Sequence, residues 1–187
     1  MSAPRLASLP EIEAAVWREL VACVRDKQHA WRNPVLATTD GELADGRVVV
    51  LREALPEPRR LLVYTDRRSA KAAQLASHPL GTLVMWSRAL GWQLRCRVKL
   101  SLETSGLAVT SRWAQIKLSP AAQDYLSPWP PGTALDEPRA MPRPDPEALG
   151  HFAVVDAQVQ SIDWLELHPD GQRRAVFETG SSRWVQP

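Results

Sequence analysis

Strict alternation of apolar and polar residues marks residues 92–103 as a long β-strand. The apolar positions are Trp92, Leu94, Cys96, Val98, Leu100 and Leu102. Successive side chains of a strand point to opposite faces, so this pattern predicts one buried face and one polar face. The polar face carries Arg95, Arg97 and Lys99. We expect that face to lie in solvent or against a second copy of the chain.

Shorter apolar runs, bounded by glycine, proline or aspartate, predict further strands. They cover residues 34–39, 47–52, 61–65, 81–86, 152–155, 159–167 and 173–178. The last two flank a turn at 168–171 and are expected to form a hairpin.

Helices are predicted in three places. Ser8 and Glu11 have the spacing of a capping box, and an apolar residue recurs every fourth position from Ile12 to Val24. Residues 69–77 are rich in good helix formers and end at a proline. Residues 111–125 are expected to be helical in two pieces, interrupted at Ser119–Pro120.

The order of these elements predicts a mainly β fold. Strands and helices do not alternate, which argues against a doubly wound sheet and favours a β-barrel with peripheral helices or an α+β domain. A chain of 187 residues is expected to form a single domain, residues 1–187. Seven of the sixteen prolines fall within 127–146, which predicts an extended loop there.

Composition narrows the function. The chain has 23 basic and 21 acidic residues, a balance too mild to predict a nucleic-acid partner. Its longest apolar runs are too short to span a membrane, and the first residues lack the apolar core of a signal peptide. Two distant cysteines and four scattered histidines offer no metal-ligand spacing. We therefore expect a cytoplasmic protein without a bound metal, nucleic acid or membrane.

Anion-binding residues gather where strands end. No hydrolase or nucleotide-loop motif is found, but residues 64–71 run from a strand end into a helix start and contain hydroxyls and cations. Free amides at a helix start suit a phosphate. The same residues also fit a simple helix cap with solvated cations, so the local pattern leaves both interpretations open.

Several of these segments together resemble the pyridoxamine 5'-phosphate oxidase family. The shared pieces, in order, are Arg47-Val-Val-Val-Leu-Arg52, Tyr64-Thr65, Ser69-Ala70-Lys71, His78-Pro79 and Gln93. The resemblance covers residues 33 to about 104 and resumes over 159–177, where Arg174 follows Trp164 by ten positions. Family members are FMN-binding split barrels, usually homodimers that hold the flavin between subunits.

The resemblance implies an FMN site at the interface of a homodimer. Arg47, Ser69 and Lys71 would bind the phosphate. The phosphate, ribityl chain or ring would contact Arg52, Tyr64, Thr65 and Gln93, with Val48, Val49 and Leu51 in the same strand segment. Trp164 and Arg174 would approach from the other subunit. Arg47 and Arg52 are five positions apart, so on one flat strand they face opposite sides, and a bulge or strand end must reconcile them.

Departures from the family pattern limit the function. Asp170 and Gln172 stand where the oxidases carry an arginine and a histidine that grip the vitamin B6 substrate, and Arg52 replaces a lysine. The resemblance therefore implies a flavin-dependent oxidoreductase that lacks this substrate specificity. The alternative is a non-catalytic flavin- or haem-binding split barrel. The pattern assigns no catalytic residue and no substrate, and it does not choose between Arg173 and Arg174 as the residue facing the flavin.

Overall fold

A computed structural model describes residues 5–137 and 150–187 of the chain. Within these residues the helices are α1 (Leu9–Arg25), α2 (Ala70–Ser77) and α3 (Leu107–Ile116), with 3-10 turns η1 (Ala30–Arg32) and η2 (Pro120–Tyr125). The strands are β1 (Val35–Thr39), β2 (Ala44–Val48), β3 (Leu51–Leu55), β4 (Arg60–Asp66), β5 (Leu80–Ser87), β6 (Trp92–Glu103), β7 (Phe152–Glu166), β8 (Arg173–Glu178) and β9 (Ser181–Val185).

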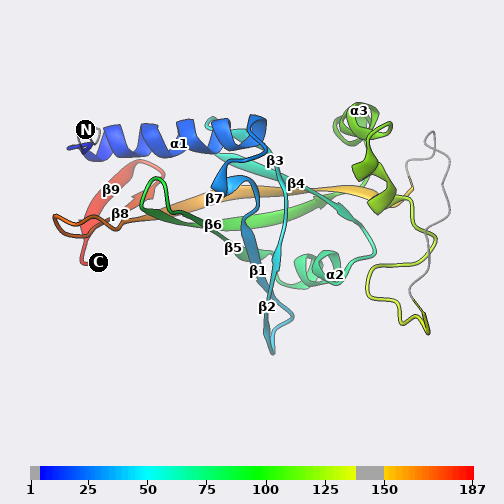
Figure 1. Cartoon of the computed structure of the whole chain (residues 1–187). Helices are drawn as coiled ribbons and strands as arrows, with labels where there is room; N and C mark the ends of the chain where they lie inside the picture. Colours follow the sequence, from blue (N-terminus) through cyan, green and yellow to red (C-terminus); the bar gives the residue numbers. More distant parts are fainter. Residues whose placement is uncertain (1–4, 138–149) are drawn as a thin grey trace.

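The strands form one antiparallel sheet in the order β2-β1-β5-β6-β7-β4-β3. The sheet branches at β7, which pairs with β4 through residues 152–158 and with β8 through residues 161–166, and β9 then pairs with β8. Figure 1 shows β6 and β7 running through the middle of the molecule, with α1 along one side. This branching is the split-barrel fold, and the prediction of a strand-rich barrel with peripheral helices is confirmed.

β7 corrects the prediction of two separate strands at 152–155 and 159–167. It is one strand of fifteen residues, and its pairing with β6 shifts register next to Val159, where Gln160 has no partner. A bulge of this kind changes which residues face inward: Val159 is buried before it, and Ile162 and Trp164 after it. The apolar alternation therefore breaks in the sequence although the strand continues.

The segment 47–52, which was predicted to be a single strand, belongs to two strands. It is not one strand, because β2 ends at Val48 and β3 begins at Leu51. Val49 and Val50 form a corner between them, and the Val49 amide donates to the carbonyl of Pro34 at 2.9 Å. β2 and β3 lie at the two ends of the sheet order, so the corner spans the gap in the barrel. β9 is a further strand that the sequence pattern did not predict.

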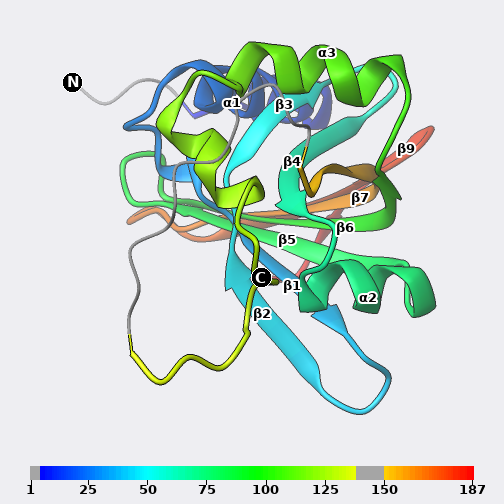
Figure 2. The same cartoon turned by 90° about the vertical axis from the view of Figure 1, so that its right-hand side faces the viewer.

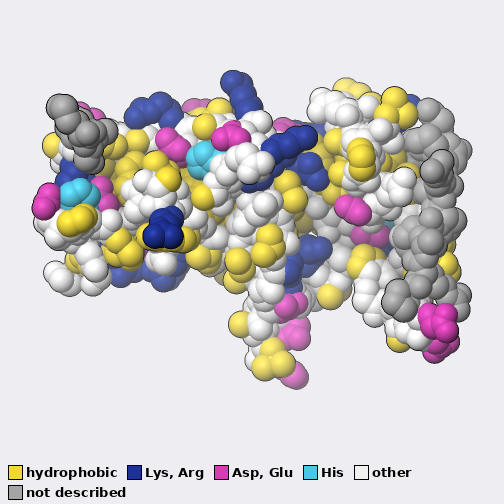
Figure 3. All heavy atoms as spheres, in the orientation of Figure 1, with side chains coloured by type: hydrophobic (Ala, Val, Ile, Leu, Met, Phe, Trp, Pro, Cys, Tyr) yellow, Lys and Arg dark blue, Asp and Glu magenta, His cyan; other side chains and the backbone are white. Residues whose placement is uncertain are grey.

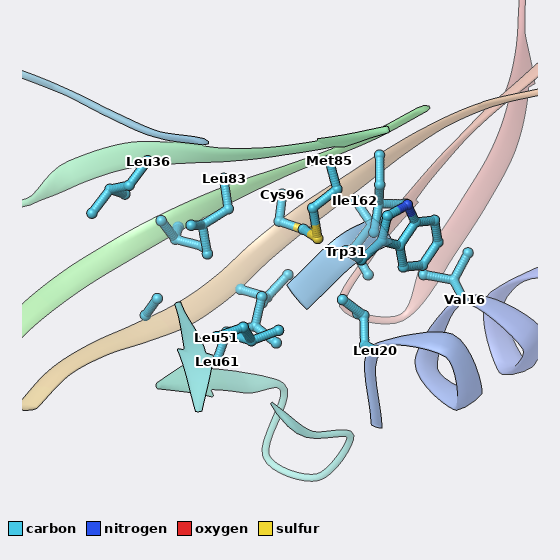
Figure 4. Packing of buried hydrophobic residues seen from close by; sticks show 14 of the residues in the cluster. Val16, Leu20, Trp31, Leu36, Leu51, Leu61, Leu83, Met85, Cys96 and Ile162 are labelled. Atoms are coloured by element: carbon cyan, nitrogen blue, oxygen red, sulfur yellow. The ribbon is translucent and has the colours of Figure 1, made fainter. Parts of the chain in front are cut away.

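The core fills the barrel interior. The predicted stripe of α1 contributes Ile12, Val16 and Leu20, all fully buried, and Val24 packs at its edge. The capping box is confirmed, since Ser8 and Glu11 exchange hydrogen bonds of 3.4 and 3.0 Å. Figure 4 shows Val16 and Leu20 of α1 beside Trp31.

A second apolar cluster lies on the outer face of β4 and β7, beneath α3 and η2. Phe152 is at its centre, with ring centroids 5.0 Å from Tyr64, 5.3 Å from Trp113 and 5.2 Å from Tyr125. Figure 2 shows α3 over β3 and β4, and α2 beside the β1–β2 hairpin. This cluster fixes Tyr64 and Tyr125 on one side of the site described below.

The structure describes only the first part of the proline-rich loop. Residues 127–137 of the loop contain no helix or strand, while 138–149 lie outside the described residues.

Cys23 and Cys96 are buried and form no disulfide. In the described part of the chain, no helix is long and apolar enough to cross a membrane, and no group of three side chains has the make-up of a metal site.

Candidate anion-binding cleft

A cleft of about 240 Å³ lies where β4 ends and α2 begins. One side is the corner Val48–Val50, and the floor is the end of β4 with the first residues of α2. Asp124, Tyr125 and Pro131 line the other side. Figure 3 shows basic side chains where the β1–β2 hairpin leaves the body of the molecule, next to α2.

Lys71 is the main cation of the cleft. Its ammonium donates to the hydroxyls of Thr65 at 3.0 Å and Ser69 at 3.5 Å. Burial lowers the pKa of Lys71, and the nearby positive charge of Arg47 lowers it further. The two carboxylates that oppose this shift, Asp45 and Asp66, are each bound by an arginine. Among the described residues, none forms an ion pair with Lys71.

The start of α2 adds neutral donors to this cation. Ser69 is the N-cap residue, but its side chain makes no capping hydrogen bond. The first amides of a helix have no acceptor within the helix and carry partial positive charge. Thr65 and Ser69 are themselves buried and lie 3.3 Å apart at their hydroxyl oxygens. The cleft thus combines an ammonium, two hydroxyls and a helix start, which are groups that bind a phosphate.

Arg47 reaches the same region from β2, but its charge is already shared. It forms an ion pair with Asp45, and its guanidinium donates to the Thr38 hydroxyl at 2.5 Å and the Gln74 side-chain oxygen at 3.0 Å. Gln74 lies on α2 and also donates to Asp45 at 3.2 Å. This network connects β1, β2 and α2 and holds Arg47 beside the cleft.

Arg52 stands on the far side of the corner, with its guanidinium carbon 5.5 Å from the centroid of the Tyr64 ring. Its Nε is buried and has no hydrogen-bond partner among the described residues. Burial raises the pKa of Tyr64 to about 12 and also raises that of Tyr125, while Arg52 opposes both shifts. Arg52 is therefore a second cation near the cleft, and no carboxylate of residues 5–137 or 150–187 forms an ion pair with it.

Gln93 and Arg174 lie elsewhere in the same protomer. They occupy one row across β6, β7 and β8, on either side of Leu165. Tyr64 belongs to the row of Val154 and Glu103, and Glu103 lies ten residues farther along β6 than Gln93. At ~3.3 Å per residue this is roughly 33 Å of extended chain. One protomer thus places these two residues far from Lys71.

Two of the residues predicted to contact the cofactor are fully buried in the protomer. Leu51 and Trp164 are both 0% exposed, because each points into the barrel core. Neither has any surface that could contact a cofactor. Val49 is nearly buried but still lines the cleft, as does the exposed Val48.

Arg173 and Arg174 lie on opposite faces of β8 and have different partners. Arg173 donates to Glu166 at 2.8 and 3.1 Å and to the Leu6 carbonyl at 2.8 Å, and it packs against Trp164. Arg174 lies on the outer face and binds Asp163 through two hydrogen bonds of 2.9 and 2.7 Å. Of the two, Arg174 is the one on the same face as Gln93.

Several residues of the site did not emerge from the sequence. Thr38 and Gln74 orient Arg47, and Asp124, Tyr125 and Pro131 form a wall of the cleft. Gln74 lies one helical turn beyond Lys71 in α2, which is a usable signal. The wall residues carry no such signal, because they follow β4 by about sixty positions.

The fold and the cleft define a class: a strand-rich split barrel with a cleft that holds a lysine and two hydroxyls at a strand–turn–helix junction. Part of the chain is similar to the pyridoxamine 5'-phosphate oxidase-like FMN-binding domain family. Residues 14–103 match the family model described as "Pyridoxamine 5'-phosphate oxidase, FMN-binding domain". The resemblance found in the sequence is thereby confirmed.

Solved structures agree on the fold. A pyridoxamine 5'-phosphate oxidase-related, FMN binding protein from Nostoc punctiforme is 25% identical, with a TM-score of 0.75 over 98% of this chain and 100% of that one. PhzG from Burkholderia lata, solved with tetrahydrophenazine-1-carboxylic acid, is 16% identical, with a TM-score of 0.71 over 100% and 98%. General Stress Protein 26 from Bacillus anthracis is 12% identical, with a TM-score of 0.53 over 80% and 92%. No curated protein sequence matches the chain.

Proposed function

We propose that this protein binds FMN in the cleft and acts as a flavin-dependent oxidoreductase. The family supplies the expectation, and the observation that carries the proposal is the unneutralised charge of Lys71 beside two hydroxyls and the uncapped start of α2. A phosphate dianion needs cations and N–H or O–H donors in one place. The cleft offers these groups, and no carboxylate in the described part of the chain forms an ion pair with Lys71.

The residues present fit the cofactor. Lys71, Ser69 and Thr65 would hold the phosphate, and Arg47 would stand behind them as an oriented second cation. The segment Val48–Val50 lines the same cleft, and Arg52, whose Nε has no partner among the described residues, lies against the ring of Tyr64. A bound flavin supplies hydride or single-electron transfer, while the protein binds it, orients it and sets the charge around it.

We further propose a homodimer with FMN at its interface. Gln93 and Arg174 are roughly 33 Å from the cleft along their own sheet, so one flavin can reach both groups only if two protomers meet. The outer face of β2, β1 and β5 carries four exposed apolar side chains, which we call the outer patch: Val35, Val48, Leu80 and Trp86. Val48, Val35 and Val84 form one row across these strands. Contiguous exposed apolar residues are typical of an interface.

The test begins with the small molecule. Purified protein should bind FMN much more tightly than riboflavin, because riboflavin lacks the phosphate but keeps the ring and ribityl chain. Equal affinity for the two would refute the phosphate site. Reduction of bound FMN by a nicotinamide donor, followed by reoxidation with turnover, separates an enzyme from a flavin carrier. A haem absorption band in place of a flavin spectrum would support the haem-binding alternative.

A further inference from the structure

The guanidinium of Arg68 is held on two sides. Asp66, a buried carboxylate, accepts from its Nε at 3.0 Å and its Nη2 at 2.7 Å, and also from its backbone amide at 2.7 Å. The same guanidinium donates to three successive carbonyls, those of Ser127 at 2.8 Å, Pro128 at 3.3 Å and Trp129 at 3.2 Å. A planar fork with five donors suits this arrangement, and an ammonium does not.

These contacts join the two sides of the cleft. Arg68 immediately precedes Ser69, the N-cap residue of α2, and lies three residues before Lys71. The carbonyls that it binds belong to residues 127–129, between Tyr125 and Pro131, which both line the cleft. Ser127 stiffens the same segment, since its hydroxyl accepts from the Trp129 amide at 3.1 Å. We call residues 124–131 the wall segment.

Two backbone hydrogen bonds hold the beginning of the wall segment, at Tyr125. The Arg67 amide donates to the His151 carbonyl at 2.8 Å, and the His151 amide donates to the Tyr125 carbonyl at 2.9 Å. These bonds fix Tyr125 but do not involve residues 127–129. The Arg67 side chain is exposed, so the two adjacent arginines have different environments.

We propose that Arg68 is a positioning residue of the cleft, which couples the phosphate-binding turn to the wall segment through its three carbonyl contacts. The proposal rests on the proposed FMN function for the identity of the ligand. An anion at Ser69 and Lys71 orders the turn, and Arg68 transmits that order to the wall segment. The charge of Arg68 is satisfied by Asp66, so Arg68 is not itself a phosphate ligand.

Hydrogen exchange tests this coupling, with FMN as the ligand. In the wild type and in Arg67→Ala, FMN should slow amide exchange both in residues 65–72 and in residues 123–129. In Arg68→Lys it should slow exchange in 65–72 alone. FMN should bind roughly tenfold more weakly, because the hydrogen bonds from Arg68 to the wall-segment carbonyls no longer help to order that side of the cleft around the ligand. Protection of both segments in Arg68→Lys would overturn the proposal.

Chemical rescue excludes a merely structural role. Adding guanidinium at millimolar concentration to Arg68→Ala should restore the FMN-dependent protection of 123–129, whereas ammonium should not. Equal rescue by both cations, or by neither, would contradict a role for the guanidinium fork.

The proposed function and this inference fail in different ways. If wild-type protein binds no FMN, the proposed function fails, and the ligand-free proteins still test Arg68. In that case Arg68→Lys must speed exchange in 123–129 without changing β6, and unchanged exchange there would refute the positioning role.

Discussion

Arg47 and Arg52 lie on strands at opposite ends of the sheet order, although only four residues separate them in the chain. The corner at Val49 and Val50 makes this possible by turning the chain from β2 into β3 across the gap in the barrel. Arg47 therefore lies near Lys71, and Arg52 lies against Tyr64, while neither of the two arginines is among the residues that line the cleft. Arg47 forms an ion pair with Asp45, whereas the Nε of Arg52 has no hydrogen-bond partner in the part of the chain that the structure describes.

Lys71→Ala should weaken FMN binding strongly. Loss of a charge-assisted contact to a phosphate costs on the order of 1.5–3 kcal/mol, or roughly 10–150-fold in affinity. Riboflavin affinity should change little, because riboflavin has no phosphate. Calorimetric titration measures both values, with Lys27→Ala as the control, since Lys27 is an exposed lysine after α1. Arg47→Ala should cost less than Lys71→Ala, because Asp45 already compensates Arg47. Equal losses for Lys71→Ala and Lys27→Ala would show that the site is misplaced.

FMN affinity should fall as the pH rises through the alkaline range. Burial and Arg47 lower the pKa of Lys71, so its ammonium loses its proton below the usual pH, and the neutral amine no longer attracts the phosphate. The phosphate stays dianionic above about pH 7, and Tyr64, with its pKa raised to about 12, does not titrate in this range. Dissociation constants between about pH 7.5 and 10.5 measure the effect. Lys71→Arg should abolish the slope, because arginine stays charged, and a slope retained in that variant would assign it to another group.

Trp86→Glu should dissociate the proposed homodimer. Trp86 is 46% exposed in the outer patch, and burial of an unpaired carboxylate there costs about 2 kcal/mol or more, roughly 30-fold in the dimer dissociation constant. Sedimentation velocity should show a monomer with reduced FMN affinity. Ala22→Glu places the same charge on the exposed face of α1 and should remain dimeric. A wild-type monomer that holds stoichiometric FMN would refute the shared site.

Trp164 and Arg174 should respond to mutation in opposite ways. Trp164 has no exposed surface, so Trp164→Ala should lower the free energy of unfolding by about 3–5 kcal/mol. Arg174 lies on the outer face, and Arg174→Ala should lower the free energy of unfolding by less than about 1 kcal/mol while weakening FMN binding in the proposed dimer. Denaturant unfolding and FMN titration separate the two effects. Trp164→Phe keeps most of the apolar volume, and a loss of FMN affinity in this variant without a loss of stability would contradict the burial.

The FMN-loaded protein should not oxidise pyridoxamine 5'-phosphate at a useful rate. Asp170 and Gln172 replace the arginine and histidine of the oxidases, and an aspartate repels an anionic substrate. Arg173 cannot substitute, because Glu166 and the Leu6 carbonyl hold it. An assay of pyridoxal 5'-phosphate formation beside a true oxidase measures this. Comparable efficiency would move the function to vitamin B6 metabolism.

Local patterns in the sequence were sufficient for much of the fold. The alternation over 92–103, the capping box at Ser8 and the helix after Ser69 are all present in the structure. Each of these signals depends on neighbours within a few positions, so the chain carries it independently of the rest of the fold. The order of short motifs from Arg47 to Gln93 likewise indicates the family from the residues alone.

The sequence motif predicted only some of the residues that line the cleft. Val48, Val49, Tyr64, Thr65, Ser69 and Lys71 follow from the sequence motif, and they line one cleft. Leu51 and Trp164 follow from the same motif but point into the core. In a strand, a shift of one residue moves a side chain from one face to the other, and the sequence motif alone does not specify which face is buried.

The sequence by itself therefore determined most of the helices and strands, the resemblance to the family and the residues at the turn from β4 into α2. Only the tertiary structure decided that 47–52 bends into two strands, that β7 continues through a bulge, and that Arg68 binds carbonyls about sixty residues away. The physical reason is the range of the interactions. Periodicity and caps are set by adjacent residues, whereas register, burial and contacts between distant segments exist only once the whole barrel has packed.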